Sequence, residues 1–355
     1  MPKVVTIVGA RPQFVKAAAV SRAIRRTGGL HEVMVHTGQH FDANMSDIFF
    51  NELGIPAPAH HLGIGGGGHG AMTGRMLEGL ETVLLNEAPE WVLVYGDTNS
   101  TLAGALAASK LHIPVVHVEA GLRSFNRRMP EEINRVLTDH IATLLLCPTE
   151  TAVRNLAAEG ITRGVHQVGD VMYDVTLHAR SQAARTSGIL ERLGLAAGAY
   201  SLATVHRAEN TDDAARLRAV VAHLEEVAAK RPVVLPLHPR TARVAREQGV
   251  ALDALRVIEP VGYLDMAALL AGCVDVHTDS GGVQKEAYFH RKPCVTLRDE
   301  TEWVETIAAG WNRLWREPDY VTPRCDIADY GDGRCAERIV EVLLQASASG
   351  APSPA

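Results

Sequence analysis

Short apolar segments rich in β-branched residues alternate with amphipathic, helix-like segments along most of this chain. The predicted strands are Val4–Val8, Glu32–His36, Trp91–Val94, Val115–Val118, Thr143–Cys147, Val165–Val168, Ser201–Val205, Val233–Leu237, Arg256–Ile258, Val274–His277 and Cys294–Leu297. Clear helices are predicted at Pro12–Arg26, Met72–Asn86, Thr101–Lys110 and Ala214–Lys230. Strands separated by helices and by short turns containing Gly or Pro indicate parallel sheets covered by helices.

Two such series meet near Gly169–Arg180, and 355 residues are enough for two domains that each bury a core. We therefore predict an α/β protein with two Rossmann-like, doubly wound domains, residues 1–169 and 170–330. A C-terminal helix at about residues 330–346 would pack back on the first domain, and residues 347–355 would form a disordered tail. Ligands of such folds bind beyond the carboxyl ends of the strands and between domains, so we expect the active site in the interdomain cleft.

Composition excludes several classes of function. The formal net charge is −6 and the pI is near 6.2, so no basic field attracts nucleic acid or anionic lipid. No window holds the roughly 18 apolar residues of a membrane helix, and the N-terminus lacks the apolar core of a signal peptide. The five cysteines lie far apart, which favours a reduced, cytoplasmic protein without a zinc site.

The segment Thr278–Ala287 is typical of a strand end followed by a Ser-Gly-Gly turn and the start of a helix. Free backbone N–H groups of Ser280, Gly281 and Gly282 at the positive end of a helix dipole would bind a phosphate. Glu286, one turn further on, suits the hydroxyl groups of a ribose. The alternative is structural, because the glycines can simply form a tight turn and Ser280 can cap the helix.

In the first domain, polar residues follow the strands where each one ends. Arg11 and Lys16 follow the first strand and are either cleft cations or solvated surface charges. Asp97 follows the strand Trp91–Val94 and is either a functional acid or a helix cap. Glu119 comes directly after four apolar residues, so it should have a partner or a function.

Glu131 adds a third acidic position in the first domain, in the predicted helix start Pro130–Arg135. It can be explained by compensation of the helix dipole. Three acidic positions are nevertheless more than helix caps require, and they could act as general acids or bases.

The second domain repeats this arrangement. His206 follows the strand Ser201–Val205 and, with Arg207 and Glu209, forms a polar cluster that favours a function. His238 follows the next strand and is either structural or functional. In the first domain, Thr37-Gly38-Gln39-His40 is equally well explained as a turn.

Three other kinds of site are not indicated. Ser280 lies in Asp-Ser-Gly-Gly rather than in the nucleophile elbow of a hydrolase. No closely spaced His or Cys set suggests a metal, and the first strand is not followed by the glycine fingerprint of a dinucleotide site.

Taken in order, the polar segments resemble the non-hydrolysing UDP-N-acetylglucosamine 2-epimerases. The resemblance covers roughly residues 5 to 310. Its first-domain motifs are Gly9-Ala10-Arg11-Pro12 with Lys16, Thr37-Gly38-Gln39-His40, Tyr95-Gly96-Asp97-Thr98, His117 to Arg123, and Pro130-Glu131-Glu132 with Asn134-Arg135. Its second-domain motifs are His206-Arg207 with Glu209-Asn210, His238-Pro239, Thr278 to Gly282 with Gln284 and Glu286, and Arg298-Asp299.

This resemblance implies a GT-B-like pair of Rossmann-type domains, a homodimer and no external cofactor. It also implies inversion at C2 of a UDP-2-acetamido sugar. In the family, the C2 proton is removed while UDP leaves C1, which gives a 2-acetamidoglucal intermediate and bound UDP. Protonation of C2 on the other face and return of UDP then give the epimer. A positioned base and a stabilised leaving group must act together, because a C2 proton beside an acetal is hardly acidic.

The same resemblance implies roles for individual residues. The catalytic candidates are Asp97, Glu119, Glu131 and His206. The candidates for binding substrate and UDP are Arg11, Lys16, Arg135, His238, Ser280, Gly281, Gly282 and Glu286. Some bacterial members bind a second UDP-sugar as an activator, and the residues that would form such a site here are Gln39, His40 and Arg207.

One segment departs from the family pattern. Many members have Thr-Glu-Arg-Pro-Glu where this chain has Thr301-Glu302-Trp303-Val304-Glu305, so Trp303 replaces a cation near the nucleotide. This string, together with residues 40–46 and 282–286, is similar to epimerases of UDP-2,3-diacetamido-2,3-dideoxy-glucuronate that serve surface polysaccharide synthesis. A uronate substrate would need an additional cation. The candidates for it are Arg123, Arg127, Arg128 and Lys285.

Several other functions remain open from the sequence. The substrate can instead be UDP-N-acetylglucosamine, or the enzyme can be a hydrolysing relative that releases free sugar. A GT-B glycosyltransferase would share the nucleotide turn, but it gives no reason for Asp97, Glu119 and Glu131. A UDP-sugar sensor could dispense with these acids.

Overall fold

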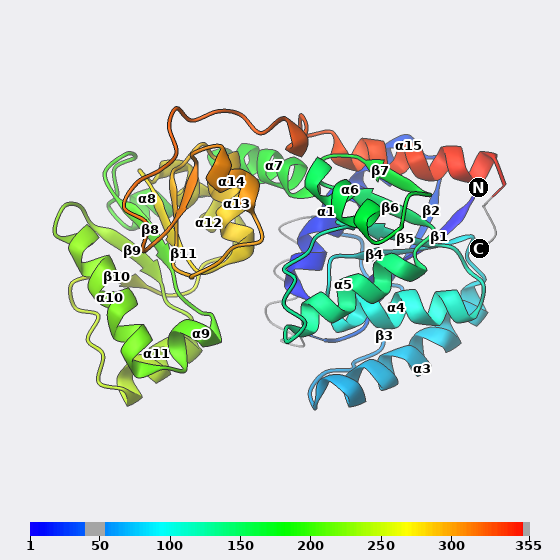
Figure 1. Ribbon diagram of the computed structural model, residues 1–355, viewed down its shortest axis with the longest axis horizontal. Coiled ribbons are helices and arrows are strands. Elements are labelled where there is room, and N and C mark those ends of the chain that lie inside the picture. Colours follow the sequence, from blue (N-terminus) through cyan, green and yellow to red (C-terminus); the bar gives the residue numbers. More distant parts are fainter. Residues whose placement is uncertain (40–53, 351–355) are drawn as a thin grey trace. The chain divides into compact units, whose positions relative to one another are not determined.

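The computed structural model describes residues 1–39 and 54–350 (Figure 1). The chain divides into two compact units. Unit 1 comprises Met1–Val175 and the C-terminal segment from Ala328, and unit 2 comprises Thr176–Ile327. The division after Val175 lies inside helix α7 (Val171–Thr186), six residues beyond the predicted boundary after residue 169.

Unit 1 contains a seven-stranded, fully parallel sheet with the order β3-β2-β1-β4-β5-β6-β7. The strands are β1 (Lys3–Val8), β2 (His31–His36), β3 (His60–His61), β4 (Trp91–Tyr95), β5 (Val115–Val118), β6 (Leu144–Cys147) and β7 (Val165–Gln167). The short edge strand β3 was not predicted. The direction of winding reverses between β1 and β4, and that switch point is where ligands bind in sheets of this kind.

Unit 2 contains a six-stranded parallel sheet with the order β10-β9-β8-β11-β12-β13. The strands are β8 (Ser201–Thr204), β9 (Val233–Pro236), β10 (Arg256–Ile258), β11 (Val276–Thr278), β12 (Cys294–Thr296) and β13 (Asn312–Leu314). Its switch point lies between β8 and β11. Two parallel sheets with helices on their faces confirm the predicted α/β fold of two Rossmann-like domains.

Helices connect the strands in both units (Figure 1). In unit 1 they are α1 (Arg11–Thr27), α3 (His69–Glu87), α4 (Asn99–Lys110), α5 (Pro130–Ile141) and α6 (Glu150–Ala158). Helix α7 follows, and unit 2 continues with α8 (Ile189–Arg192), α9 (Ala208–Thr211), α10 (Ala214–Ala228), α11 (Pro239–Glu247), α12 (Tyr263–Gly272), α13 (Gly281–Phe289) and α14 (Val304–Ala308). A 3₁₀ turn (Ala328–Tyr330) and helix α15 (Cys335–Ala348) follow.

Helix α15 packs against α1 of unit 1, as Figure 1 shows. Its first turn is held by Asp174, which accepts hydrogen bonds from the backbone N–H groups of Cys335 (3.1 Å) and Ala336 (2.9 Å). The helix continues through Ala348, so the predicted disordered tail is wrong for its first two residues. Residues 351–355 lie outside the described part of the chain.

In each unit, apolar side chains of the sheet and of the covering helices pack together into a core. In unit 1, Val5, Ile7 and Val94 of the sheet pack with Met76 and Leu80 of α3.

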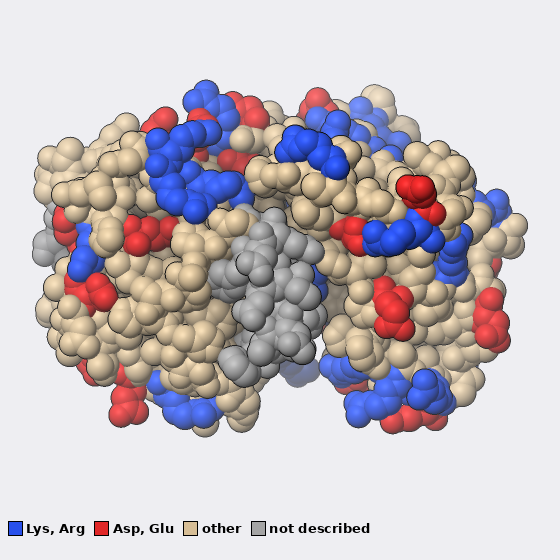
Figure 2. Space-filling view, turned by 180° about the vertical axis from the view of Figure 1, so that it is seen from behind, with Lys and Arg blue, Asp and Glu red and all other residues tan. Residues whose placement is uncertain are grey.

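Figure 2 shows Lys and Arg side chains mixed with Asp and Glu side chains over the face in view, rather than gathered into one basic surface. Among the described residues, no helix combines the length and the apolar character that crossing a membrane requires.

Candidate active site

The switch point of unit 1 is built around the turn that follows β1. A side chain at Gly9 would collide with Thr37 and Ser100, so the turn needs glycine there. The buried side chain of Gln13 accepts hydrogen bonds from the N–H groups of Gly9 (2.8 Å) and Ala10 (3.1 Å). Its amide nitrogen donates to the Tyr95 carbonyl oxygen at the end of β4 (2.9 Å). Gln13 therefore fixes the ends of two central strands relative to each other.

Asp97 lies in the turn between β4 and α4 and is not the cap of that helix. Thr98 is the cap, and its hydroxyl accepts a hydrogen bond from the Thr101 N–H group. The Asp97 carboxylate instead forms an ion pair with Arg135 of α5. The side chain of Asp97 is 32% exposed, so it is reachable by a ligand. The interpretation of Asp97 as a helix cap is therefore wrong.

Arg135 is buried and also forms an ion pair with Glu132 (2.8 Å). Glu132 in turn accepts hydrogen bonds from the N–H groups of Ser124 and Phe125, both at 2.9 Å. Burial alone would raise the pKa of Glu132, but these N–H groups and Arg135 outweigh it and lower that pKa. The result is a connected chain of charges from Asp97 to the loop that precedes α5.

Glu119 follows β5 and forms an ion pair with Lys16 of α1. Both side chains are about nine-tenths buried. Glu119 has a backbone φ of +72°, a left-handed conformation that is costly for a residue other than glycine. The Glu119 carboxylate is therefore held next to Lys16, which is the partner that the sequence led us to expect for this acid.

A second charge network of unit 1 is centred on the buried side chains of His117, Asp139 and Arg123. His117 of β5 contacts Asp139 through Nδ1 (2.7 Å) and the Gly96 carbonyl oxygen through Nε2 (2.7 Å). The two ring nitrogens of His117 thus face a carboxylate and a carbonyl oxygen, which hold the ring from both sides. Burial would raise the pKa of Asp139, but the charges of His117 and Arg123 outweigh it and hold that pKa below its usual range.

Arg123 completes this network. It donates to Asp139 (2.6 Å) and binds both carboxylate oxygens of Glu159 (2.7 and 2.8 Å). Because these acids occupy its guanidinium, the prediction that Arg123 could serve as a free cation for a uronate is wrong. Asp139 also accepts a hydrogen bond from the Gly121 N–H group (3.1 Å), so the network holds the turns at the ends of both β4 and β5.

Three other predicted residues of unit 1, Arg11, Gln39 and Glu131, are described by the structure. Glu131 is half-buried in the first turn of α5 and has no hydrogen bond or ion pair within the described residues. Arg11 is the exposed first residue of α1. Gln39 accepts hydrogen bonds from the N–H group (3.0 Å) and hydroxyl (2.8 Å) of Ser100 in α4. His40 lies outside the described residues.

In unit 2, Asp279 connects the two strands of the switch point. This buried carboxylate accepts hydrogen bonds from the N–H groups of His206 and Arg207, both at 2.9 Å, and contacts His206 Nδ1 at 2.9 Å. Burial would raise the pKa of Asp279, but the contact with His206 and these N–H groups lower it. The side chain of His206 is 45% exposed. Its ring is thus fixed at one nitrogen and accessible at the other.

The predicted phosphate turn starts helix α13. Ser280 caps this helix, with its hydroxyl accepting from the Val283 N–H group at 3.5 Å. Gly281 and Gly282 are the first helical residues. The Glu286 carboxylate accepts a hydrogen bond from the hydroxyl of Tyr263 (3.3 Å). The structural interpretation of Ser280 as a cap is confirmed. The Ser280 N–H group donates to the Thr278 hydroxyl (2.9 Å), so the N–H groups of Gly281 and Gly282, rather than that of Ser280, suit an anion.

His238 starts helix α11 and accepts a hydrogen bond from the Arg240 N–H group at 3.2 Å. Thr241 of this helix donates to the Val205 carbonyl oxygen (2.9 Å), so the start of α11 lies at the end of β8 with His206. Unit 2 therefore brings His206, Arg207 and His238 to neighbouring strand ends.

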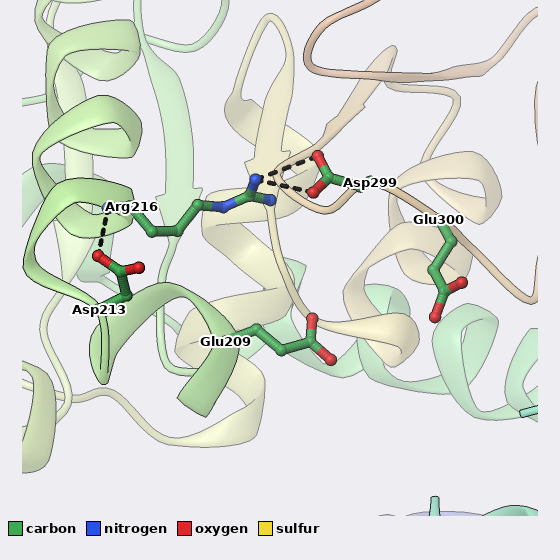
Figure 3. Close-up of a pocket in the computed structure, with 5 residues that line it drawn as sticks. All are labelled: Glu209, Asp213, Arg216, Asp299 and Glu300. Atoms are coloured by element: carbon green, nitrogen blue, oxygen red, sulfur yellow. Dashed lines mark hydrogen bonds and ion pairs between the residues drawn. The ribbon is translucent and has the colours of Figure 1, made fainter. Parts of the chain in front are cut away.

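Unit 2 also has an acidic pocket, shown in Figure 3. Its lining residues are Glu209, Asp213, Arg216, Asp299 and Glu300. Arg216 points to Asp299 and contacts both of its carboxylate oxygens (2.9 and 3.1 Å). Four carboxylates against one guanidinium repel a diphosphate, so this pocket is a poor candidate for the nucleotide phosphates.

Three positions were missed from the sequence: Gln13, Asp139 and Asp279 were not given roles, although each crosslinks strand ends. A signal for one of them existed on α5, where Glu132, Arg135 and Asp139 recur at helical spacing and are buried. Charged residues on the buried face of a helix need partners. The sequence does not show which partners these are.

The chain is similar to known proteins over nearly its whole length. The family model described as UDP-N-acetylglucosamine 2-epimerase matches residues 22–344. A UDP-2,3-diacetamido-2,3-dideoxy-D-glucuronate 2-epimerase of Pseudomonas aeruginosa is 54% identical, with 97% of this chain and 99% of the relative covered. A UDP-N-acetylglucosamine 2-epimerase of Methanocaldococcus jannaschii is 41% identical, with 96% and 98% covered.

Solved structures are similar over the same length. The Methanocaldococcus jannaschii UDP-GlcNAc 2-epimerase in complex with UDP-GlcNAc and UDP has a TM-score of 0.88 and 42% identity, covering 97% of this chain and 99% of that one. The Neisseria meningitidis UDP-GlcNAc 2-epimerase bound to UDP-GlcNAc has a TM-score of 0.85 and 29% identity, covering 97% and 100%.

Proposed function

This chain belongs to the UDP-N-acetylglucosamine 2-epimerase family, and we propose that it inverts C2 of a UDP-2-acetamido sugar by elimination and re-addition of UDP. As a member of this family it is an epimerase that acts on a UDP-sugar. The observation that best supports the mechanism is the set of acids at the switch point of unit 1. Asp97 and Glu119 have fixed cationic partners, while Glu131 has none within the described residues.

We assign the proton transfers to these carboxylates. In the first step, one carboxylate removes the C2 proton while the C1–O bond breaks, UDP leaves with the electron pair, and a C1–C2 double bond forms. In the second step, a proton is delivered to the opposite face of C2 and the diphosphate oxygen attacks C1. Two groups on opposite faces are needed, one acting as base and the other as acid. Asp97 and Glu119 are each held by a cation, whereas the Glu131 side chain has no partner within the described residues and is available for the sugar.

Unit 2 would hold UDP while the glucal exists. The N–H groups at the start of α13 and the dipole of this helix suit the diphosphate. Glu286, held by Tyr263, suits the ribose hydroxyls, and His206, held by Asp279, can contact the leaving group. Arg11, Arg135 and His238 are further proposed substrate contacts, and Arg207 and Gln39 are proposed for an activator site.

The proposed substrate is UDP-2,3-diacetamido-2,3-dideoxy-glucuronate, converted to its manno epimer for surface polysaccharide. Support comes from the 54% identity to the Pseudomonas aeruginosa enzyme that carries this substrate in its name. Exposed Arg127 and Arg128 lie in the loop that Glu132 anchors, separated from Glu131 by Met129 and Pro130, and neither has an ion pair within the described residues. They are the proposed partners of the uronate carboxylate.

Paired turnover tests this proposal. The purified chain is incubated separately with UDP-2,3-diacetamido-2,3-dideoxy-glucuronate and with UDP-N-acetylglucosamine, and kcat/KM is compared. We expect the uronate to be preferred and UDP to remain attached to the epimer. Preference for UDP-N-acetylglucosamine would leave the epimerase mechanism intact and overturn the substrate assignment. Release of free sugar would instead indicate a hydrolysing enzyme.

We further propose a homodimer in the cytoplasm. All five cysteines are free thiols, and four of them are buried, which suits a reducing compartment. Sedimentation of the full chain tests the dimer, and a monomer at assay concentration would overturn it.

A further inference from the structure

Trp303 carries a buried hydrogen-bond donor that has no acceptor. The residue lies between β12 and α14 and is 5% exposed, and its indole Nε1 has no partner within the described residues. The indole nitrogens of the other three tryptophans are all bonded: Trp91 to Ser347 (2.9 Å), Trp311 to the Cys325 carbonyl oxygen (2.7 Å) and Trp315 to Asp299 (3.3 Å). A buried donor left unsatisfied costs about 1–3 kcal/mol, so an acceptor is expected to arrive with a ligand.

The position of this donor identifies where the acceptor would be. Trp303 Nε1 lies 3.4 Å from the point that a Cβ atom of Gly281 would occupy. Gly281 is the first residue of α13, a nine-residue helix whose opening N–H groups face a position suited to an anion. The indole N–H therefore borders the same place as the helix N-terminus, and a ligand with acceptors only would satisfy both.

A cation and an ion pair lie next to the Trp303 indole. Lys285 is buried, and its Nζ lies 3.9 Å from the centre of the Trp303 ring, so a cation lies against the π face of the indole. Such a cation withdraws electron density from the indole and makes its N–H a better donor. Glu302 lies 2.8 Å from the same Gly281 point, but its other oxygen is paired with buried Arg298 (2.9 Å). That ion pair carries no net charge, so the Glu302 carboxylate does not exclude an anion from this place.

We propose that the Trp303 indole N–H donates a hydrogen bond to a diphosphate oxygen of UDP bound at the N-terminus of α13. This inference rests on the proposed function and adds a binding residue to its nucleotide site. Phosphate oxygens are acceptors only, so they match a site that offers backbone N–H groups, an indole N–H and a nearby ammonium group. Trp303 thereby supplies a neutral donor where many family members have an arginine.

Nuclear magnetic resonance of the full chain, with its tryptophan indoles labelled with ¹⁵N, tests the contact directly. The chain has four tryptophans, and a Trp303→Phe variant assigns the relevant resonance. We expect saturating UDP to move the Trp303 N–H proton downfield, as a new hydrogen bond does, while uridine, which lacks the diphosphate, leaves it in place. Trp91, already bonded in unit 1, is the internal control. A Trp303 signal that responds equally to uridine and UDP, or to neither, would overturn the proposal.

Affinity gives an independent measurement. Trp303→Phe removes the N–H but keeps an aromatic ring over Lys285, and we expect it to weaken UDP binding about five- to tenfold, the effect of one hydrogen bond. Uridine binding should be unchanged. Wild-type UDP affinity in this variant would contradict the proposal, and the wild-type spectra decide the matter if the variant does not fold. If UDP binds through Trp303 but C2 does not exchange with solvent, the epimerase function fails while this inference survives.

Discussion

The two units have the same architecture but hold their candidate site residues in different ways. In unit 1, charged side chains hold one another: Lys16 with Glu119, and Asp97 with Arg135. In unit 2, backbone groups take a larger part, because Asp279 accepts hydrogen bonds from backbone N–H groups and α13 begins with Gly281 and Gly282 after the Ser280 cap. The difference suits a division of labour in which fixed carboxylates move protons and backbone donors hold a diphosphate.

The largest expected effect is on catalysis in unit 1. Asp97→Asn keeps the shape of the side chain but removes its charge and basicity, and we expect kcat to fall about 10²- to 10⁴-fold. UDP affinity, measured by calorimetry, should stay close to the wild-type value. Glu90→Gln, which changes an exposed acid of the same unit, is the control. Equal losses of turnover and UDP affinity in Asp97→Asn would assign this residue to binding instead.

The next effect concerns stability. Asp139→Asn removes the buried anion that pairs with His117 and Arg123, and we expect the free energy of unfolding to fall by about 3–5 kcal/mol. Asp332→Asn breaks an exposed ion pair with Arg338 in the same unit and should cost no more than about 1 kcal/mol. Urea denaturation measures both. Similar losses in the two variants would show that the buried network does not hold unit 1 together as described.

Two adjacent glycines provide a matched test in unit 2. A Cβ atom at Gly281 would lie 2.8 Å from one oxygen of Glu302, whose other oxygen is held by Arg298, whereas at Gly282 the nearest atom is 3.9 Å away. Displacing a packed group costs about 1–3 kcal/mol, so we expect Gly281→Ala to weaken UDP binding about tenfold. Gly282→Ala should bind UDP nearly as the wild type does. The opposite order would contradict the packing of Glu302 and Trp303 against α13.

The smallest effect is a pH dependence in unit 2. Burial lowers the pKa of His290 to about 4, from an ordinary value of 6.5. Between these pH values the unfolded chain binds the proton and the folded chain does not, so stability is lost as the pH falls from 6.5 toward 4. At pH 5 this amounts to about 1–2 kcal/mol, and His290→Gln should remove that part of the loss. His166→Gln, at an exposed position in unit 1, should leave the dependence unchanged in urea titrations at pH 7 and pH 5.

Much of the fold follows from local pattern, because buried parallel strands are apolar over their whole length. The two strands that were missed, β3 (His60–His61) and β13 (Asn312–Leu314), are short edge strands that contain polar residues. Edge strands are covered on fewer sides, so their sequences carry less of the apolar signal. The sequence predicts helix α15 to end at about residue 346, but the helix continues to Ala348.

The candidate site was predictable only in part. Residues such as Asp97 and His206 stand out because a polar residue directly after a buried strand lies at the ligand-binding edge of the sheet. Their partners Arg135 and Asp279 come from elements that are distant in sequence, and pairing across such distances depends on the tertiary fold. For the same reason, the sequence leaves Arg123 among the candidate cations for a uronate, whereas in the structure it is paired with Asp139 and Glu159.

Exchange of the C2 proton with solvent tests the central claim most directly. The chain is incubated in D₂O with UDP-2,3-diacetamido-2,3-dideoxy-glucuronate, and in parallel with UDP-N-acetylglucosamine, and the nucleotide sugars are analysed by mass spectrometry and NMR. If the carboxylates of unit 1 exchange the C2 proton while UDP stays bound, the epimer formed will carry one deuterium, at C2. Wild-type enzyme that places no deuterium at C2 of either UDP-sugar would contradict the account.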